Sequence, residues 1–266
     1  MSLLVKARRT GREIVEVTPQ SAGWKHVGFR AVRLAAGDVE RLNTGTQELC
    51  LVVLRGTVDV SVGGTLHPEL GTRDSVFDDL PPAAVYVPPG REVVVTARRE
   101  AEVALCFAPG SGRHEARVID PKTMTRSVRG KGSNTRHVRD ILPQTEPADH
   151  LLVVEVVTPA GNASSYPPHK HDRDAAPEET QLEETYYHRL NPPQGFAFQR
   201  VYTDDRSLDE SMAVEDNDVV MVPRGYHPCV APHGYDLYYL NVMAGPGRVW
   251  IFKNDPAHEW MLTSAT

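Results

Sequence analysis

The sequence has no apolar run near the ~20 residues that a membrane-spanning helix needs, which argues against a helical membrane protein. Its opening segment, MSLLVKARRTGREIVEV, has only a very short apolar stretch before its basic residues, unlike a secretory signal. Cysteine is also scarce, since Cys50, Cys106 and Cys229 lie far apart and form no CxxC pair. We therefore expect buried, reduced thiols in a cytoplasmic protein, without a disulfide framework.

Positive charge is in deficit, because the formal net charge is −6, and this argues against general attraction to nucleic acid. Long stretches with a helical period are missing as well. The 266 residues are 40% hydrophobic and 24% charged, which predicts a packed globule of one large domain or two ordinary ones.

What the sequence does contain is a series of short strand-like segments. Its 21 prolines and 20 glycines are scattered and divide the chain into short pieces. Between them lie runs rich in valine, leucine, tyrosine and phenylalanine, which favour β-strands. We therefore predict an all-β protein. The runs cover residues 48–54, 57–62, 84–87, 92–96, 102–107, 151–157, 196–202, 219–222 and 236–242.

Residues 113–139 form a strongly basic stretch in this acidic protein. The stretch holds eight lysines or arginines against Glu115 and Asp120. One interpretation is a solvated connector between two domains. The other is that some of these cations help to hold an anionic substrate, because arginine side chains bind carboxylates well. Replacing Arg129 and Arg136 and measuring substrate binding distinguishes the two.

A candidate metal site lies in the second half of the chain. In the segment SYPPHKHD, His169 and His171 are two residues apart, so on an extended strand they point to the same side while Lys170 faces away. Glu184 opens the strand-like run ETYYHRL, and His227 follows a Pro-x-Gly turn. A lone HxH is weak evidence, but three imidazoles and one carboxylate together suit a first-row divalent ion.

This order of ligands resembles the two sequence motifs of the cupin superfamily. There are departures from the usual pattern, since the gap from His171 to Glu184 is longer and the spacing from Gly225 to His227 is one residue shorter. The second motif also lacks its usual opening glycine and closing asparagine. The inserted loop leaves Glu183 as a rival ligand, although Glu184 lies closer to the aromatic run.

The resemblance extends to one family. The segments SSYPPHKHD, LEETYYHR, GFAFQRVYTDD, VVMVPRGYHP, GYDLYYLNVMAGP and NDPAHEW resemble the 5-deoxy-glucuronate isomerases of inositol catabolism, which are bicupin uronate isomerases. The resemblance implies two tandem antiparallel β-barrels of the jelly-roll type. Residues 1–112 would form a barrel without metal ligands, 113–150 a basic connector and 151–266 the metal-binding barrel. We also expect a homo-oligomer with one divalent metal per chain. Zinc is the metal that we expect, with manganese or iron as alternatives.

The implied reaction is the aldose–ketose isomerisation of a sugar acid, 5-deoxy-D-glucuronate, to 5-dehydro-2-deoxy-D-gluconate. The carbonyl moves when a proton leaves the α-carbon and is returned to the neighbouring carbon, the former carbonyl carbon. A metal stabilises the negative charge that develops on oxygen during this transfer. Glu184 is a candidate ligand or base. Tyr186 and His188 share its face by strand alternation and are candidate proton shuttles. A buried aromatic and a packed histidine are the alternative interpretations of these two residues.

The substrate carboxylate needs a cation, for which Arg200 and Arg224 are candidates, and Tyr238 lies on a polar-aromatic run that suits a sugar. The alternatives are an ion pair of Arg200 with a nearby carboxylate and a plain surface turn around Arg224. The same metal ligands also fit a cupin-type iron dioxygenase. A third hypothesis, from another class, is a non-catalytic sugar-acid-binding cupin.

Overall fold

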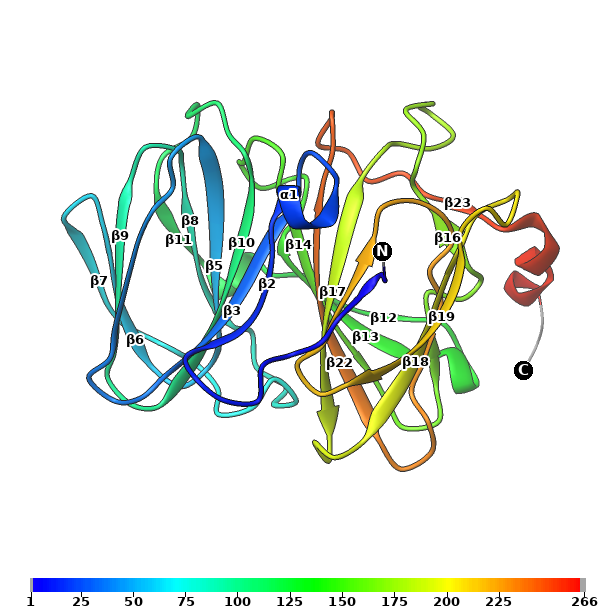
Figure 1. The fold of residues 1–266 in the computed structure, drawn as a ribbon, viewed down its shortest axis with the longest axis horizontal. Coiled ribbons are helices and arrows are strands. Elements are labelled where there is room, and N and C mark those ends of the chain that lie inside the picture. Colours follow the sequence, from blue (N-terminus) through cyan, green and yellow to red (C-terminus); the bar gives the residue numbers. More distant parts are fainter. Residues whose placement is uncertain (1, 264–266) are drawn as a thin grey trace. The chain divides into compact units, whose positions relative to one another are not determined.

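A computed structural model describes residues 2–263 of the chain (Figure 1). Strands dominate and the helices are very short, so the predicted all-β class is confirmed. The chain divides into two compact units. The N-terminal unit comprises Arg8–Thr125 and Arg139–Val154, and the C-terminal unit comprises residues up to Ala7, Arg126–Val138 and residues from Glu155 onward.

The N-terminal unit is built from two antiparallel sheets, whose strand orders in the described chain are β11-β8-β5-β10-β3-β2 and β4-β9-β6-β7. Gly and Pro turns separate the strands, as the sequence predicts. The elements are β2 (Glu13–Val17), α1 (Pro19–Ala22), β3 (Gly28–Leu34), β4 (Val39–Asn43), β5 (Gln47–Arg55), β6 (Val58–Val62), β7 (Thr65–Leu70), β8 (Ala83–Val87), β9 (Glu92–Ala97), β10 (Ala101–Pro109), β11 (Arg117–Ile119) and the 3₁₀ helix η1 (Pro121–Thr123).

Apolar side chains fill the space between these two sheets. Alternate residues of β5, namely Leu49, Leu51 and Val53, pack against Val60 and Val95 and their neighbours from β6 and β9. Each such buried valine or leucine contributes roughly 1.5–3 kcal/mol. This core is built from valine, leucine and alanine side chains.

Glu48, which opens β5 as a ligand glutamate would, has a structural role instead. Strand alternation turns it away from the apolar core that Leu49 enters. Its side chain is fully buried, and it accepts hydrogen bonds from the hydroxyl of Tyr86 at 2.8 Å and from the backbone N–H groups of Asp149, His150 and Leu151 at 2.7, 2.6 and 2.6 Å. The carboxylate thus fixes a distant segment, 149–151, onto β5.

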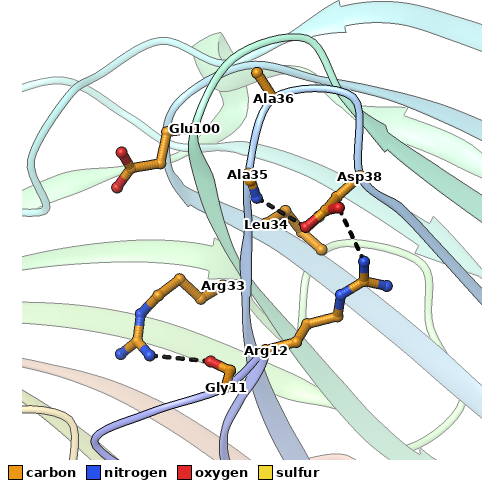
Figure 2. Close-up of a pocket in the computed structure, with 8 residues that line it drawn as sticks. All are labelled: Gly11, Arg12, Arg33, Leu34, Ala35, Ala36, Asp38 and Glu100. Atoms are coloured by element: carbon orange, nitrogen blue, oxygen red, sulfur yellow. Dashed lines mark hydrogen bonds and ion pairs between the residues drawn. The ribbon is translucent and has the colours of Figure 1, made fainter.

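A surface pocket of the N-terminal unit lies where β3 ends (Figure 2). Two arginines line it, but both already have partners. Arg12 lies 3.1 Å from Asp38, and Arg33 donates to the carbonyl of Gly11 at 3.3 Å. The pocket holds none of the predicted site residues and offers no free cation to a ligand.

The C-terminal unit contains a seven-stranded sheet of order β1-β20-β17-β22-β14-β13-β12, a four-stranded sheet of order β15-β21-β18-β19 and the two-stranded pair β16-β23. β13 and β14 run across the boundary between the units. The elements are β1 (Leu4–Val5), β12 (Arg126–Arg129), η2 (Gly132–Asn134), β13 (Arg136–Leu142), β14 (Leu152–Thr158), β15 (Ala163–Ser164), β16 (His169–Lys170), β17 (Glu183–Asn191), β18 (Phe196–Tyr202), β19 (Asp209–Glu215), β20 (Val219–Val222), β21 (Cys229–Val230), β22 (Asp236–Ala244), β23 (Lys253–Asn254) and η3 (Pro256–Leu262).

Two features of the division differ from the boundaries expected from the sequence. The first strand of the chain, β1, pairs with β20 and therefore belongs to the C-terminal unit. The basic stretch is not a bare connector, because it supplies β11, β12 and part of β13. Its charged composition indicated a solvated segment, but composition does not show which backbone groups pair in a sheet.

Cys50, Cys106 and Cys229 are all free and buried, as predicted. Within the described chain, no helix is both long enough and apolar enough to span a membrane.

Candidate metal centre

The HxH segment begins in β16 and ends one residue beyond it, and β16 pairs with β23 through His169 opposite Asn254. His169 and His171 point to the same side of this strand, with ring centroids 6.3 Å apart. Lys170 points to the other side, where it is buried and its Nζ donates to Asp204 at 2.8 Å and to Asp172 at 3.2 Å. The lysine is therefore a structural cation behind the ligands and not part of the site.

Glu184 enters the same space from β17, the strand between β20 and β22. It lies opposite Val222 on one neighbour and Met243 on the other. Its Oε2 lies 3.1 Å from Nε2 of His171. Glu183, the rival in the sequence, projects from the opposite face of β17 because successive strand residues alternate. The structure therefore brings Glu184 to the histidines.

His227 arrives from the turn that follows β20. Gly225 in this turn has φ +90°, and a Cβ there would lie 2.5 Å from the carbonyl oxygen of Tyr202, so glycine is required. The Nδ1–H of His227 donates to the carbonyl of Gly225 at 2.9 Å. The N–H of Gly225 in turn donates to Asp172 at 2.9 Å, which ties this turn to the HxH segment.

The three imidazoles converge. One ring nitrogen from each of His169, His171 and His227 lies within 4.8 Å of the other two. Oε2 of Glu184 lies 3.3 Å from Nε2 of His227. His171 donates its Nδ1–H to the carbonyl of Leu182 at 3.1 Å, so both His171 and His227 turn Nε2 toward the glutamate.

The unsatisfied atoms of the cluster fit a divalent cation. Oε1 of Glu184 and Nε2 of His227 are buried and have no hydrogen-bond partner in the described structure. Buried polar atoms are rarely left unpaired, and each costs roughly 1–3 kcal/mol if it stays so. An ion bound between the imidazoles and the carboxylate would satisfy both atoms with the donor set that zinc, manganese and iron accept.

The electrostatics of the cluster favour a neutral imidazole at two of its three histidines. Burial lowers the pKa of His227 to about 4, although the charge of Glu184 opposes this. Burial, together with the other two histidines, lowers the pKa of His169 well below its usual value. Burial alone would lower the pKa of His171, but the hydrogen bond to Glu184, the charge of Glu184 and backbone hydrogen bonds together raise it. Neutral imidazoles are the metal-binding form, so two of the ligands need not lose a proton at neutral pH.

The cluster is open on one side. His171, Glu184 and His227 are almost completely buried, whereas His169 is partly exposed. The ring of Phe252, itself 43% exposed, lies 4.6 Å from the ring of His169. A small molecule would therefore reach the ligands past His169 and Phe252.

Tyr186 lies beside the cluster, as its position on β17 predicts. Its ring centroid is 5.7 Å from that of His227, and its hydroxyl lies 3.3 Å from the hydroxyl of Ser165. Burial, followed by the charge of Glu184, raises its pKa well above the usual value. The phenol is therefore protonated at neutral pH and is a proton donor.

His188 lies one layer further from the ligands. Its ring stacks on Tyr186 at 5.9 Å, and its Nε2 bonds to Oε1 of Gln199 at 2.9 Å. Its Nδ1 is buried without a hydrogen-bond partner among the described residues. Burial lowers the pKa of His188 to about 4, so the ring is neutral. The proton-shuttle role that the sequence suggests stays a prediction.

We expect His188 to make the protein less stable in mild acid. Below about pH 6.5 a histidine of the unfolded chain takes up a proton, but folded His188 does so only near pH 4. The unfolded state then binds more protons, so the free energy of unfolding falls by about 2 kcal/mol between neutral pH and pH 5. Urea titrations of the wild type and of His188→Gln at both pH values test this, and an equal loss in both proteins would contradict it.

The predicted substrate residues lie elsewhere. Arg200 projects from the outer face of β18, where it forms a bidentate pair with Asp209 at 2.7 and 2.6 Å. Arg224 is exposed in the turn before His227. Tyr238 points away from the cluster, because its register partner is Arg189 and its hydroxyl donates to Glu155 at 3.1 Å. In the described structure, Arg200, Arg224 and Tyr238 therefore lie outside the group formed by the histidine ligands.

The sequence offered Tyr238 and Tyr239 in one polar-aromatic run, and the choice of Tyr238 as the substrate residue was made without knowledge of the strand register. Tyr239 lies opposite His188 and shares the inward face of the sheet, with its ring 4.8 Å from that of Tyr186. Which residues of β22 face inward depends on how β22 pairs with β17, and the sequence does not reveal this register. Trp250 was not singled out either; its ring lies under the guanidinium of Arg129 and 6.0 Å from the ring of Phe252.

Comparison with known proteins now places the chain. A model of the KduI/IolB family matches residues 3–261. The chain belongs to the KduI/IolB family. A 5-deoxy-glucuronate isomerase of Geobacillus kaustophilus is 54% identical over 251 residues, which are 94% of this chain and 91% of the relative.

Solved structures agree with this family membership. The crystal structure of an IolB-like protein from Salmonella typhimurium is similar with a TM-score of 0.97 and 49% identity, covering 98% of this chain and 100% of that one. An oxalate decarboxylase from Lactobacillus farciminis, in a formate complex, has a TM-score of 0.66 and 12% identity, covering 99% of this chain and 91% of that one. The second likeness shows the fold alone.

Proposed function

We propose that this KduI/IolB family member is an aldose–ketose isomerase that converts 5-deoxy-D-glucuronate to 5-dehydro-2-deoxy-D-gluconate in inositol catabolism. The relatives named as 5-deoxy-glucuronate isomerases support the substrate. The observation that carries the proposal is the convergence of His169, His171, His227 and Glu184 beside a protonated tyrosine.

The reaction needs no external oxidant or reductant. The proton on C2 of the aldose moves to C1, and the hydroxyl proton on O2 moves to O1, so that the aldehyde becomes an alcohol and the alcohol becomes a ketone. The intermediate is an enediol. A divalent ion at the cluster would supply Lewis-acid stabilisation of the developing negative charge on oxygen, worth several kcal/mol.

The residues of the chain supply the remaining roles. His169, His171, His227 and Glu184 would hold the ion, and we expect zinc, with manganese or iron also suited to this donor set. Glu184 would ligate the ion through one carboxylate oxygen and would accept the C2 proton with the other. Tyr186 is protonated at neutral pH and can donate a proton to a substrate oxygen.

Two surrounding groups keep this arrangement rigid. His188 stacks on Tyr186 and thereby limits the movement of its ring. Asp172 accepts from Gly225 and so holds the turn that carries His227. Partners of this kind around a metal site typically change affinity or activity by roughly 10–100-fold when they are lost.

The direct test is incubation of the purified protein with 5-deoxy-D-glucuronate. We expect NMR to show ketone formation, and we expect a chelator to abolish it and added zinc or manganese to restore it. No turnover with zinc, manganese or iron would refute the isomerase. Oxygen consumption with an iron-loaded protein would instead support the dioxygenase, which the same ligands permit.

We also propose a cellular compartment and an oligomeric state for the enzyme. Three buried free thiols suit the reducing cytoplasm, where we propose the enzyme works. We retain the expectation of a homo-oligomer, which light scattering of the purified protein tests.

A further inference from the structure

Arg129 and Arg136 lie at the same end of a β-hairpin in the C-terminal unit. Arg129 ends β12 and Arg136 begins β13, and these strands are neighbours in the sheet. The connection is tight, because a Cβ added at Gly130 would lie 2.0 Å from the carbonyl oxygen of Asn134. Both arginine side chains are partly buried. The hairpin therefore brings the two arginine positions together at one end of the neighbouring strands.

Neither arginine has a carboxylate partner in the described structure. Nη1 of Arg136 donates to the backbone and side-chain oxygens of Asn134, at 3.1 and 3.2 Å, and both acceptors are neutral. The guanidinium of Arg129 lies over the ring of Trp250, 5.7 Å from its centroid. Arg200, by contrast, forms a bidentate pair with Asp209.

The two guanidinium groups act on each other electrostatically. Burial lowers the pKa of Arg136, and the charge of Arg129 lowers it further, which shows that the two guanidinium groups repel each other. Two partly buried like charges beside one another are unfavourable unless an anion lies between them.

Contacts connect the hairpin to the open side of the cluster. Trp250, under Arg129, lies 6.0 Å from Phe252, and Phe252 lies 4.6 Å from His169. Nδ2 of Asn134 donates to the carbonyl of Tyr166 at 2.9 Å. Tyr166 follows Ser165, whose hydroxyl lies 3.3 Å from that of Tyr186. The arginines thus border the side from which a substrate reaches His169.

We propose that Arg129 and Arg136 together bind the carboxylate of the sugar acid while its carbonyl end lies at the His169–His171–His227 cluster. This inference rests on the proposed function, because a uronate carries its carboxylate at the end opposite the aldehyde. Two guanidinium forks match one carboxylate with several charge-assisted hydrogen bonds. They would select acids against neutral sugars, since a neutral sugar leaves both charges uncompensated.

Calorimetric titration of the metal-loaded full-length protein with D-glucuronate tests the inference without relying on turnover. We expect Arg136→Gln and Arg129→Gln each to raise the Kd by about tenfold or more, because a hydrogen bond to a charged group is worth roughly 1.5–3 kcal/mol. D-glucose, which replaces the carboxylate by an alcohol, should bind the wild type more weakly than D-glucuronate and be insensitive to both substitutions.

Arg200→Gln is the matched control, since it removes an arginine that is paired on the outer face. It should leave the Kd unchanged, and all variants should keep the wild-type metal content. If Arg136→Gln fails to fold, Arg129→Gln carries the same test. Wild-type Kd values in both variants, or equal binding of D-glucose and D-glucuronate by the wild type, would overturn the inference.

The isomerase assay separates this failure from failure of the function. Turnover of 5-deoxy-D-glucuronate with an unchanged KM in both arginine variants would leave the isomerase intact and remove the carboxylate site. Absence of turnover, combined with weakened D-glucuronate binding in the variants, would keep the carboxylate site and remove the proposed reaction.

Discussion

Replacing His171 with alanine should remove the metal and reduce kcat by about 10³-fold or more, since the Lewis acid is worth several kcal/mol and each 1.36 kcal/mol is tenfold in rate. His171 is buried, and its Nε2 lies 3.1 Å from Oε2 of Glu184. Loss of its imidazole leaves at most two histidines and one carboxylate for the ion. Elemental analysis and the ketone assay, run on the same preparation, measure both effects.

His233→Ala is the control for this experiment, because His233 is exposed and belongs to no ligand group. It should keep both the metal and the activity of the wild type. A His171→Ala protein that retains stoichiometric metal and full turnover would rule out the cluster as the catalytic centre.

The phenylalanine variant of Tyr186 should lower kcat by about 10²–10⁴-fold, the usual contribution of a positioned proton donor. The substitution removes only the hydroxyl, which lies 3.3 Å from Ser165, and it keeps the ring that packs on His188 and Tyr239. Metal content and KM should change little, since the hydroxyl lies against Ser165 and is not one of the ligands. Steady-state kinetics with 5-deoxy-D-glucuronate provide the measurement.

Tyr187→Phe offers a closely matched comparison. Tyr187 is the next residue of β17, but it faces the opposite side of the sheet, where its hydroxyl donates to Asn217. Its loss should cost about 1 kcal/mol of stability, as for a typical hydrogen bond, and leave kcat unchanged. Equal kcat values for the two variants would show that the Tyr186 hydroxyl has no part in the chemistry.

The sequence was sufficient for those features that depend on local pattern. Strand-length apolar runs predicted the all-β class, because strands form wherever β-branched and aromatic residues lie between turn residues. The alternation rule predicted that His169 and His171 share a side and that Glu184 and Tyr186 share another. The structure brings these four residues to one place, together with His227.

Features that depend on strand register could not be predicted. Tyr238 and Tyr239 are equivalent in the sequence, and only the pairing of β22 with β17 shows that Tyr239 faces inward. The outward direction of Arg200 likewise follows from the placement of β18, not from its composition.

The cation site illustrates the same limit. Composition identified residues 113–139 as basic and named Arg129 and Arg136 for mutation, but it could not distinguish a connector from an anion site. That choice depends on a contact between segments more than thirty residues apart, such as that between Asn134 and Tyr166, at 32 residues. Long-range pairing of this kind leaves no periodic signal in the chain.

The direction in which Glu48 points limits how this protein can be redesigned. Grafting two histidines ahead of β5 would not create a second catalytic centre in the N-terminal unit, because the glutamate that they would need to meet faces away from Leu49 and Leu51 and already accepts four hydrogen bonds. An engineer would have to hollow out the valine and leucine interior and move a carboxylate by one position. The two halves are thus similar in strand pattern but not interchangeable in chemistry.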